Sequence, residues 1–267
     1  MFLFFMRNQN TLIPDHENSV ELDSNSLLFA ILKEERVPRL QEEAIWTLWR
    51  RKDPAAVPHL REIYLNSRHE RVRAKALKVL GWLDPDSSKI FVLPVLKNRK
   101  EKTIVKQAAI AVLGSLSEDW ALEALCKQLK KREVALRLEA VRALRRHLRR
   151  SRLGEVSLKW IVAFLIRAVK KDENQEVRTA AMQALLYVRL NEVETLLYRV
   201  LEDCHWPVRC AAMQCLAQMC LAHAPQDSSK AMEALGRCLQ MIPRTDPMNT
   251  LLHRAFDTVL ARSVGFR

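Results

Sequence analysis

The chain has 267 residues, 49% of them apolar, and a formal net charge of +13. It is therefore long and apolar enough to bury a sizeable core, which excludes global disorder. Leu, Ala, Arg, Glu and Lys are abundant while only 5 residues are glycine, as in chains made mostly of helices joined by short turns, and we expect an all-α protein.

Residues 1–25 are expected to form a poorly ordered or extended N-terminal segment. The run from Met1 to Met6 is apolar and ends at Arg7, but it lacks a basic start and is too short for a signal-peptide core or a membrane span. We therefore expect a soluble intracellular protein that is cytoplasmic, with a nuclear location as the alternative, and that has no membrane partner.

One pattern recurs between residues 26 and 262. An aliphatic residue, often followed by Arg or Lys, stands four positions before a small residue, and further aliphatics stand one and four positions after it. The small residues are Ala44, Ala76, Ala109, Ala140, Ala181, Ala212 and Ala255. Their separations are 31–33 residues, except for one of 41 and one of 43. This repeat length predicts an α-α superhelix, a solenoid of about seven helical hairpins with two insertions, followed by a tail at 263–267.

The small residues mark the second helix of each hairpin, and shorter apolar segments mark the first helices. These segments are 57–64, 90–96, 121–129, 158–169, 193–201 and 231–239. Gly81 and Gly114 each fall five residues after the small residue of their repeat, where glycine weakens a helix. We therefore expect a nearby helix end or a close packing contact at both glycines.

The stretch from Ala111 to Leu125 resembles a HEAT repeat, and more narrowly it is similar to the short-period repeats of phycobilisome lyases. The link Asp-x-x-x-x-Val-Arg of these repeats appears at 172–178 and 203–209, whereas the earlier repeats lack the aspartate. The resemblance implies an armadillo-type α-solenoid, a fold that serves many unrelated partners. It also implies a structural role for the basic residue that follows each link's aliphatic, paired with an acid or with backbone of an adjacent repeat: Arg73, Lys106, Arg137, Arg178 and Arg209.

The sequence carries no pattern that predicts an enzyme, a metal site, a cofactor or a small-molecule substrate. His69-Glu70 invites comparison with the HEAT-like di-iron deoxyhypusine hydroxylases, but the corresponding positions before Gly81 and Gly114 hold other residues. Phosphate-binding loops, nucleophile elbows and zinc-binding cysteine pairs are missing from the sequence. The six cysteines are therefore expected to be buried small hydrophobes.

Positive charge is concentrated at residues 97–152, which hold 16 basic and 6 acidic residues, a net charge of +10. A nucleic-acid ligand for this segment is one interpretation, because it would neutralise several phosphates. The run Arg145–Arg152 also allows a nuclear localisation signal. Arginines at a helix end are, however, also favoured by the helix dipole.

In HEAT arrays the second helices line the concave face, so the repeat register predicts the residues of a partner-binding groove. They comprise an aromatic end, a cationic middle and an amide end: Trp46, Trp49, Arg50, Lys78, Trp82, Arg142, Arg145, Arg146, Arg149, Gln183, Tyr187 and Gln214. Aromatic and arginine side chains are the usual anchors of interfaces. We expect a non-enzymatic scaffold that binds an acidic or helical protein segment. The alternatives are that the tryptophans cap the first repeats or pack between them, and that the arginines form a merely solvated face.

Overall fold

The computed structural model describes residues 24–33, 37–150, 154–188 and 191–264, and within these ranges every regular element is an α-helix. Most of the N-terminal segment predicted at 1–25, and residues 265–267 of the predicted tail, lie outside the described residues. The helices are α1 Ser24–Lys33, α2 Pro38–Arg51, α3 Ala56–Asn66, α4 Glu70–Leu83, α5 Ser88–Lys97, α6 Thr103–Leu113, α7 Asp119–Gln128, α8 Val134–Arg150, α9 Glu155–Lys171, α10 Gln175–Leu185, α11 Asn191–Val200, α12 Trp206–Ala222, α13 Ser228–Met241 and α14 Pro247–Val264.

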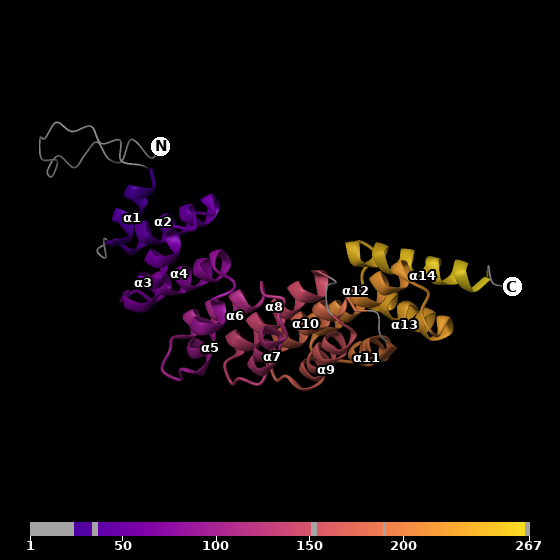
Figure 1. Ribbon diagram of the computed structural model, residues 1–267. Helices are drawn as coiled ribbons and strands as arrows, with labels where there is room; N and C mark the ends of the chain where they lie inside the picture. The colour runs from indigo at the N-terminus through magenta and orange to yellow at the C-terminus, as the bar shows by residue number, and fades with distance from the viewer. Residues whose placement is uncertain (1–23, 34–36, 151–153, 189–190, 265–267) are drawn as a thin grey trace, which may run out of the picture.

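The helices form two layers that follow a curved path, as Figure 1 shows. The even-numbered helices, which are the predicted second helices, lie along the inner side of the bend, and the odd-numbered helices from α3 to α13 lie along the outer side. Each even-numbered helix packs extensively on the next, whereas neighbouring odd-numbered helices touch sparingly. The structure is therefore the predicted all-α solenoid, in which each repeat contacts mainly its neighbours.

The repeated alanines explain the close approach of the inner helices. Six of the seven are fully buried, and Ala44 in the first repeat is 3% exposed. In α6 the residues at the other repeat positions, Val105, Ile110 and Leu113, are also fully buried. The stripe of positions i, i+4, i+5 and i+8 thus faces the core, and its smallest member lets the adjacent helix come near.

The two longer repeat spacings are taken up largely by helix length. Between Ala140 and Ala181 the helices α8 and α9 each have 17 residues, whereas α6 and α10 have 11. Between Ala212 and Ala255 the helices α12, α13 and α14 have 17, 14 and 18 residues. The two insertions therefore appear in the structure as longer helices.

Both glycines lie at the tight contacts that the sequence predicted. A Cβ atom built on Gly81, inside α4, would lie 2.6 Å from Cγ2 of Val112 on α6. Gly114 follows directly after α6, and a Cβ atom there would lie 2.9 Å from the Cβ of Ala143 on α8. Neither contact leaves room for a side chain without movement of the neighbouring helix.

Among the described residues, no helix combines the length and the apolar character needed to span a membrane.

Candidate functional site

The links between paired helices carry a ladder of ion pairs that joins successive repeats. Arg137 on α8 makes a bidentate pair with Asp172 in the link before α10, at 2.7 Å from Nε to Oδ2 and 2.8 Å from Nη2 to Oδ1. Its Nη1 donates to the carbonyl oxygens of Lys131 and Arg132 in its own link. The side chains of Arg137 and Asp172 are 12% and 7% exposed, so this pair is largely shielded from water. The structural role predicted for Arg137 is confirmed.

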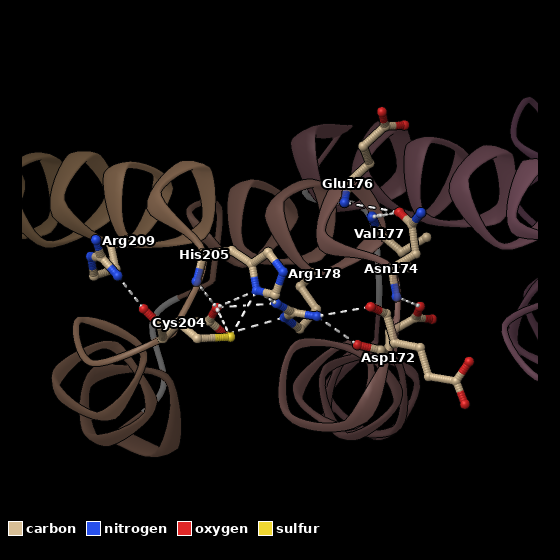
Figure 2. Close-up of polar contacts among 10 residues, drawn as sticks. Asp172, Asn174, Glu176, Val177, Arg178, Cys204, His205 and Arg209 are labelled. Carbon is tan, nitrogen blue, oxygen red and sulfur yellow. Dashed lines mark hydrogen bonds and ion pairs between the residues drawn. The ribbon is translucent and has the colours of Figure 1, made fainter.

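Arg178 repeats this arrangement one hairpin later, as Figure 2 shows. Its Nη1 donates to the carbonyl oxygen of Asp172, and its Nε and Nη2 pair with the two carboxylate oxygens of Asp203 at 3.2 and 3.1 Å. Burial by itself would raise the pKa of the Asp203 carboxyl. Hydrogen bonds from Arg178 and from the backbone N–H of His205, together with the positive charge of Arg178, outweigh burial and lower the pKa.

The other ladder residues follow the pattern in part. Arg73 pairs with Glu101 at 2.5 Å, so that a glutamate takes the place of the aspartate, and its Nε donates to the carbonyl oxygen of Tyr64. Lys106 and Arg209 donate to carbonyl oxygens of their own links. Among the described residues, ion pairs to the next link therefore form at Arg73, Arg137 and Arg178, whereas Lys106 and Arg209 donate to backbone oxygens of their own links.

Asp203, Cys204 and His205 bring three potential metal-ligand atoms within 4.8 Å of one another. Arg178 already donates to Asp203 and lies 2.7 Å from Nδ1 of His205, so a metal ion would have to displace a guanidinium group (Figure 2). The cluster is best explained as part of the ladder.

The expectation that all the cysteines are buried is wrong for Cys204, which is exposed, and Cys210 is half-buried. Cys204 belongs to a link, whose turn residues face water, and not to the core stripe of a helix. The other four thiols are buried, and burial raises the pKa of Cys126, Cys215 and Cys220 to about 12.

Two residues of the basic run at the end of α8 cap the C-terminal end of α6, the preceding inner helix. Nε2 of the buried His147 lies 3.2 Å from the carbonyl oxygen of Leu113, and Arg150 donates to the carbonyl oxygen of Ser115 at 3.3 Å. These groups satisfy carbonyl oxygens at the C-terminal end of α6, where cations are favoured. Burial lowers the pKa of His147. Residues 151–153 of the predicted localisation signal lie outside the described residues.

The tryptophans of the predicted groove form one cluster across the first two complete hairpins. The ring centroids of Trp46 and Trp49 on α2 are 4.3 Å apart in a stacked arrangement, and that of Trp82 on α4 lies 5.2 Å from that of Trp49. Lys78 places its ammonium group 4.9 Å from the centroid of Trp82. The three rings are half-buried against one another, and Arg50 beside them is exposed. Their packing joins α2 to α4 while one side of the cluster stays accessible.

The four arginines of α8 fall into two pairs. Arg142 and Arg146 approach Glu139 on the same helix, at 3.8 and 3.4 Å. Arg145 and Arg149 instead place their guanidinium groups 5.8 and 5.9 Å from the ring centroid of Tyr187, just after α10. Among the described residues, neither Arg145 nor Arg149 forms an ion pair. The sequence register did not reveal this division, although Glu139 stands at helical spacing from both of its partners.

The residues predicted to form the amide end of the groove are less closely assembled. Gln183 lines a hollow between α8 and α10 together with Arg142 and Arg145. Gln214 on α12 is half-buried, and no described contact joins it to the arginines or to Tyr187. The sequence also missed Thr179, which lines the same hollow as Gln183 and stands one turn before it on α10.

Comparisons with known proteins agree with the observed fold. A family model for HEAT repeats matches residues 25–104 and 162–244. An engineered protein superposes with a TM-score of 0.53 at 17% sequence identity, covering 88% of this chain and 68% of that chain.

Two further solved structures are similar. One is the complex of CpcE and CpcF of phycocyanin lyase from Nostoc sp. PCC7120, with 18% identity over 93% of this chain and 99% of that chain and a TM-score of 0.49. The other is a designed armadillo repeat protein, with 15% identity over 87% of this chain and 98% of that chain and a TM-score of 0.45. A search of curated protein sequences finds no significant match.

The matched HEAT-repeat segments cover more than half of the chain, and they coincide with the stacked hairpins that the structure shows. The chain therefore belongs to the HEAT-repeat family.

Proposed function

We propose that the chain is a non-enzymatic scaffold that holds an acidic or helical segment of a partner protein against its inner helices. HEAT and armadillo solenoids commonly serve as interaction scaffolds. In this proposal Arg142, Arg145, Arg146 and Arg149 supply charge, and the tryptophan cluster formed by Trp46, Trp49 and Trp82 supplies an apolar anchor.

The observation that carries the proposal is the pair Arg145 and Arg149. Both lie on an inner helix, both are held over Tyr187, and neither has a carboxylate partner among the described residues. Guanidinium groups held against an aromatic ring lose little further side-chain freedom when they bind, and arginine, tyrosine and tryptophan are enriched where interfaces gain most of their affinity. A partner carboxylate would therefore meet charges that are already positioned.

The test is replacement of the four arginines by alanine. In a pull-down from cell extract followed by mass spectrometry, we expect the wild-type protein to retain specific proteins that the variant loses. The thermal melt should change little, because none of the four makes a ladder pair. Unchanged capture by the variant would contradict the assignment of the groove.

A nucleic-acid ligand for residues 97–152 is the second candidate, favoured by the net charge of +10. The structure uses many of these cations internally: Lys106, Lys127, Arg137, Arg142, Arg146 and Arg150 all contact acids or carbonyl oxygens of the chain. Electrophoretic mobility of mixed oligonucleotides at two salt concentrations separates the candidates, because binding through phosphates weakens steeply with salt. Retardation at low salt that is lost at high salt would favour nucleic acid.

A further inference from the structure

A hollow of about 530 Å³ opens between α8 and α10. Leu138, Val141 and Ala180 contribute apolar side chains to it, and Pro207 at the start of α12 closes one side. Arg142, Arg145, Thr179 and Gln183 contribute polar groups, and Glu176 with Gln175 lies where α10 begins. The hollow therefore joins an apolar wall to a small set of hydrogen-bonding groups, as ligand sites do.

Two of the residues that line this hollow each carry a buried polar atom that has no hydrogen-bond partner. The two atoms are Nε of Arg145 and Oγ1 of Thr179. Buried polar groups in proteins are nearly always satisfied, so two unsatisfied atoms on facing helices of one hollow indicate a missing partner. Only two other buried side-chain atoms in the described part of the chain share this condition, and both are amide oxygens of glutamines elsewhere.

The two unpaired atoms differ in what they can bind. Nε–H of an arginine donates only, and together with one Nη–H it forms the edge that grips a carboxylate through two parallel hydrogen bonds. The hydroxyl of Thr179 can add a third donor. Tyr187 lies beside the guanidinium group of Arg145, with its ring centroid 5.8 Å from Cζ, at the distance of a cation–π contact.

The charge balance of the hollow favours a single negative charge. Arg142 is already close to Glu139, and Glu176 adds a carboxylate to the lining, which leaves Arg145 as the cation of the lining that forms no ion pair among the described residues. A monoanionic, planar group matches this arrangement better than a phosphate dianion, whose second charge would face Glu176.

From these contacts we infer that the hollow between α8 and α10 is a subsite for a glutamate or aspartate side chain of a partner segment. On binding, Arg145 and Thr179 turn these buried atoms toward the hollow, so that Nε and Nη of Arg145 grip the carboxylate and Thr179 donates its hydroxyl to it. The apolar wall receives the methylene groups of the same side chain. This inference rests on the proposed function and names the chemical group that the scaffold recognises.

Thr179→Val is the sharpest test, because valine keeps the shape and removes only the hydroxyl. If the hydroxyl had no ligand, its removal would leave the melting temperature unchanged or higher, since a buried unsatisfied group is lost. The probe is a fluorescein-labelled peptide of alternating glutamate and alanine, followed by fluorescence anisotropy. We expect Thr179→Val to weaken its binding by about 10-fold or more, as loss of a hydrogen bond to a charged group does, without loss of thermal stability.

Arg145→Gln should weaken the same peptide at least as much, whereas two control variants should not. Thr258→Val removes a half-buried threonine hydroxyl on α14, and Arg237→Gln removes one positive charge on the outer helix α13. A matched peptide of alternating glutamine and alanine should not bind. A phosphoserine peptide and a single-stranded oligonucleotide should compete less well than the glutamate peptide.

The experiment distinguishes a wrong assignment of the subsite from a wrong assignment of the groove. If the four-arginine variant loses the glutamate peptide while Thr179→Val and Arg145→Gln retain wild-type affinity, the groove stands and the subsite is wrong. If the wild-type protein does not bind the glutamate peptide at low salt, or if the oligonucleotide or phosphopeptide binds more tightly through Arg145 and Thr179, the inference is overturned.

Discussion

Single residues decide how closely the inner helices approach. Gly81 lies inside α4 with the side chain of Val112 directly over its Cα, whereas Gly236 lies inside α13 with no neighbouring atom within 4 Å of a Cβ position. The two glycines are thus in the same local conformation but in different tertiary surroundings. Their local cost to the helix is the same, about 1 kcal/mol relative to alanine.

Alanine at these two positions should therefore act in opposite directions. Gly81→Ala should lower the free energy of unfolding by about 1–3 kcal/mol, because the new methyl group overpacks the contact with Val112. Gly236→Ala should raise it by roughly 0.5–1 kcal/mol through helix propensity alone. Urea denaturation followed by circular dichroism measures both. A stabilising effect of Gly81→Ala would show that α4 and α6 separate easily.

At the scale of elements, the ladder of ion pairs holds each hairpin to the next. Arg137 and Asp172 are 35 residues apart in the chain and join the links before α8 and α10. Because both side chains are largely buried, loss of one leaves the other with an uncompensated charge. The pair between Arg61 and Asp84 offers a contrast, since its atoms are 3.9 Å apart and the Arg61 side chain is 53% exposed.

Arg137→Gln should thus lower the free energy of unfolding by roughly 3 kcal/mol. Arg61→Gln, the same substitution in the exposed pair, should change it by no more than about 0.5 kcal/mol. Urea denaturation of the two variants side by side provides the comparison. Equal effects would mean that the ladder contributes no more than an ordinary surface pair.

Some properties of these elements follow from the sequence and others do not. The helices and the buried alanine stripe follow from a repeat whose period is visible in the chain, and the resemblance to HEAT repeats correctly assigned Arg73, Arg137 and Arg178 to a structural role. The burial of Cys204 was predicted wrongly, because cysteine composition favours the core whereas this cysteine stands in a link. The lengths of α8, α9 and α12 to α14 were also not predicted as helix extensions.

For the whole molecule, contacts between neighbouring repeats predict that the two ends respond separately to damage. Leu48 in α2 and Val259 in α14 are both fully buried, near opposite ends of the stack. A solenoid behaves approximately as a chain of units coupled only to their neighbours. Local unfolding at one end should therefore leave the far end protected.

Leu48→Ala should lower the free energy of unfolding by about 2–5 kcal/mol through lost packing. It should therefore speed amide hydrogen exchange in α1 to α4 and leave exchange in α13 and α14 unchanged. Val259→Ala should give the reverse pattern. Mass spectrometry of deuterated peptides reads both ends in one experiment. Uniform acceleration along the chain in either variant would show a single cooperative unit.

The residues of the predicted groove mark the limit of prediction from the sequence. Repeat register placed Arg142, Arg145, Arg146 and Arg149 on one helix face, because helical spacing is a local property. It did not separate those near Glu139 from those over Tyr187, nor did it pick out Thr179.

The difference between what the sequence determines and what only the tertiary structure determines has a physical reason. Fold class, repeat number and the core face depend on local periodicity and on contacts between adjacent repeats, and both are written into the order of residues. The pairing state of the arginines depends on rotamers and, for Arg145 and Arg149, on Tyr187 of the next hairpin. The hollow between α8 and α10 and its two unpaired atoms therefore became visible only once the helices were placed side by side.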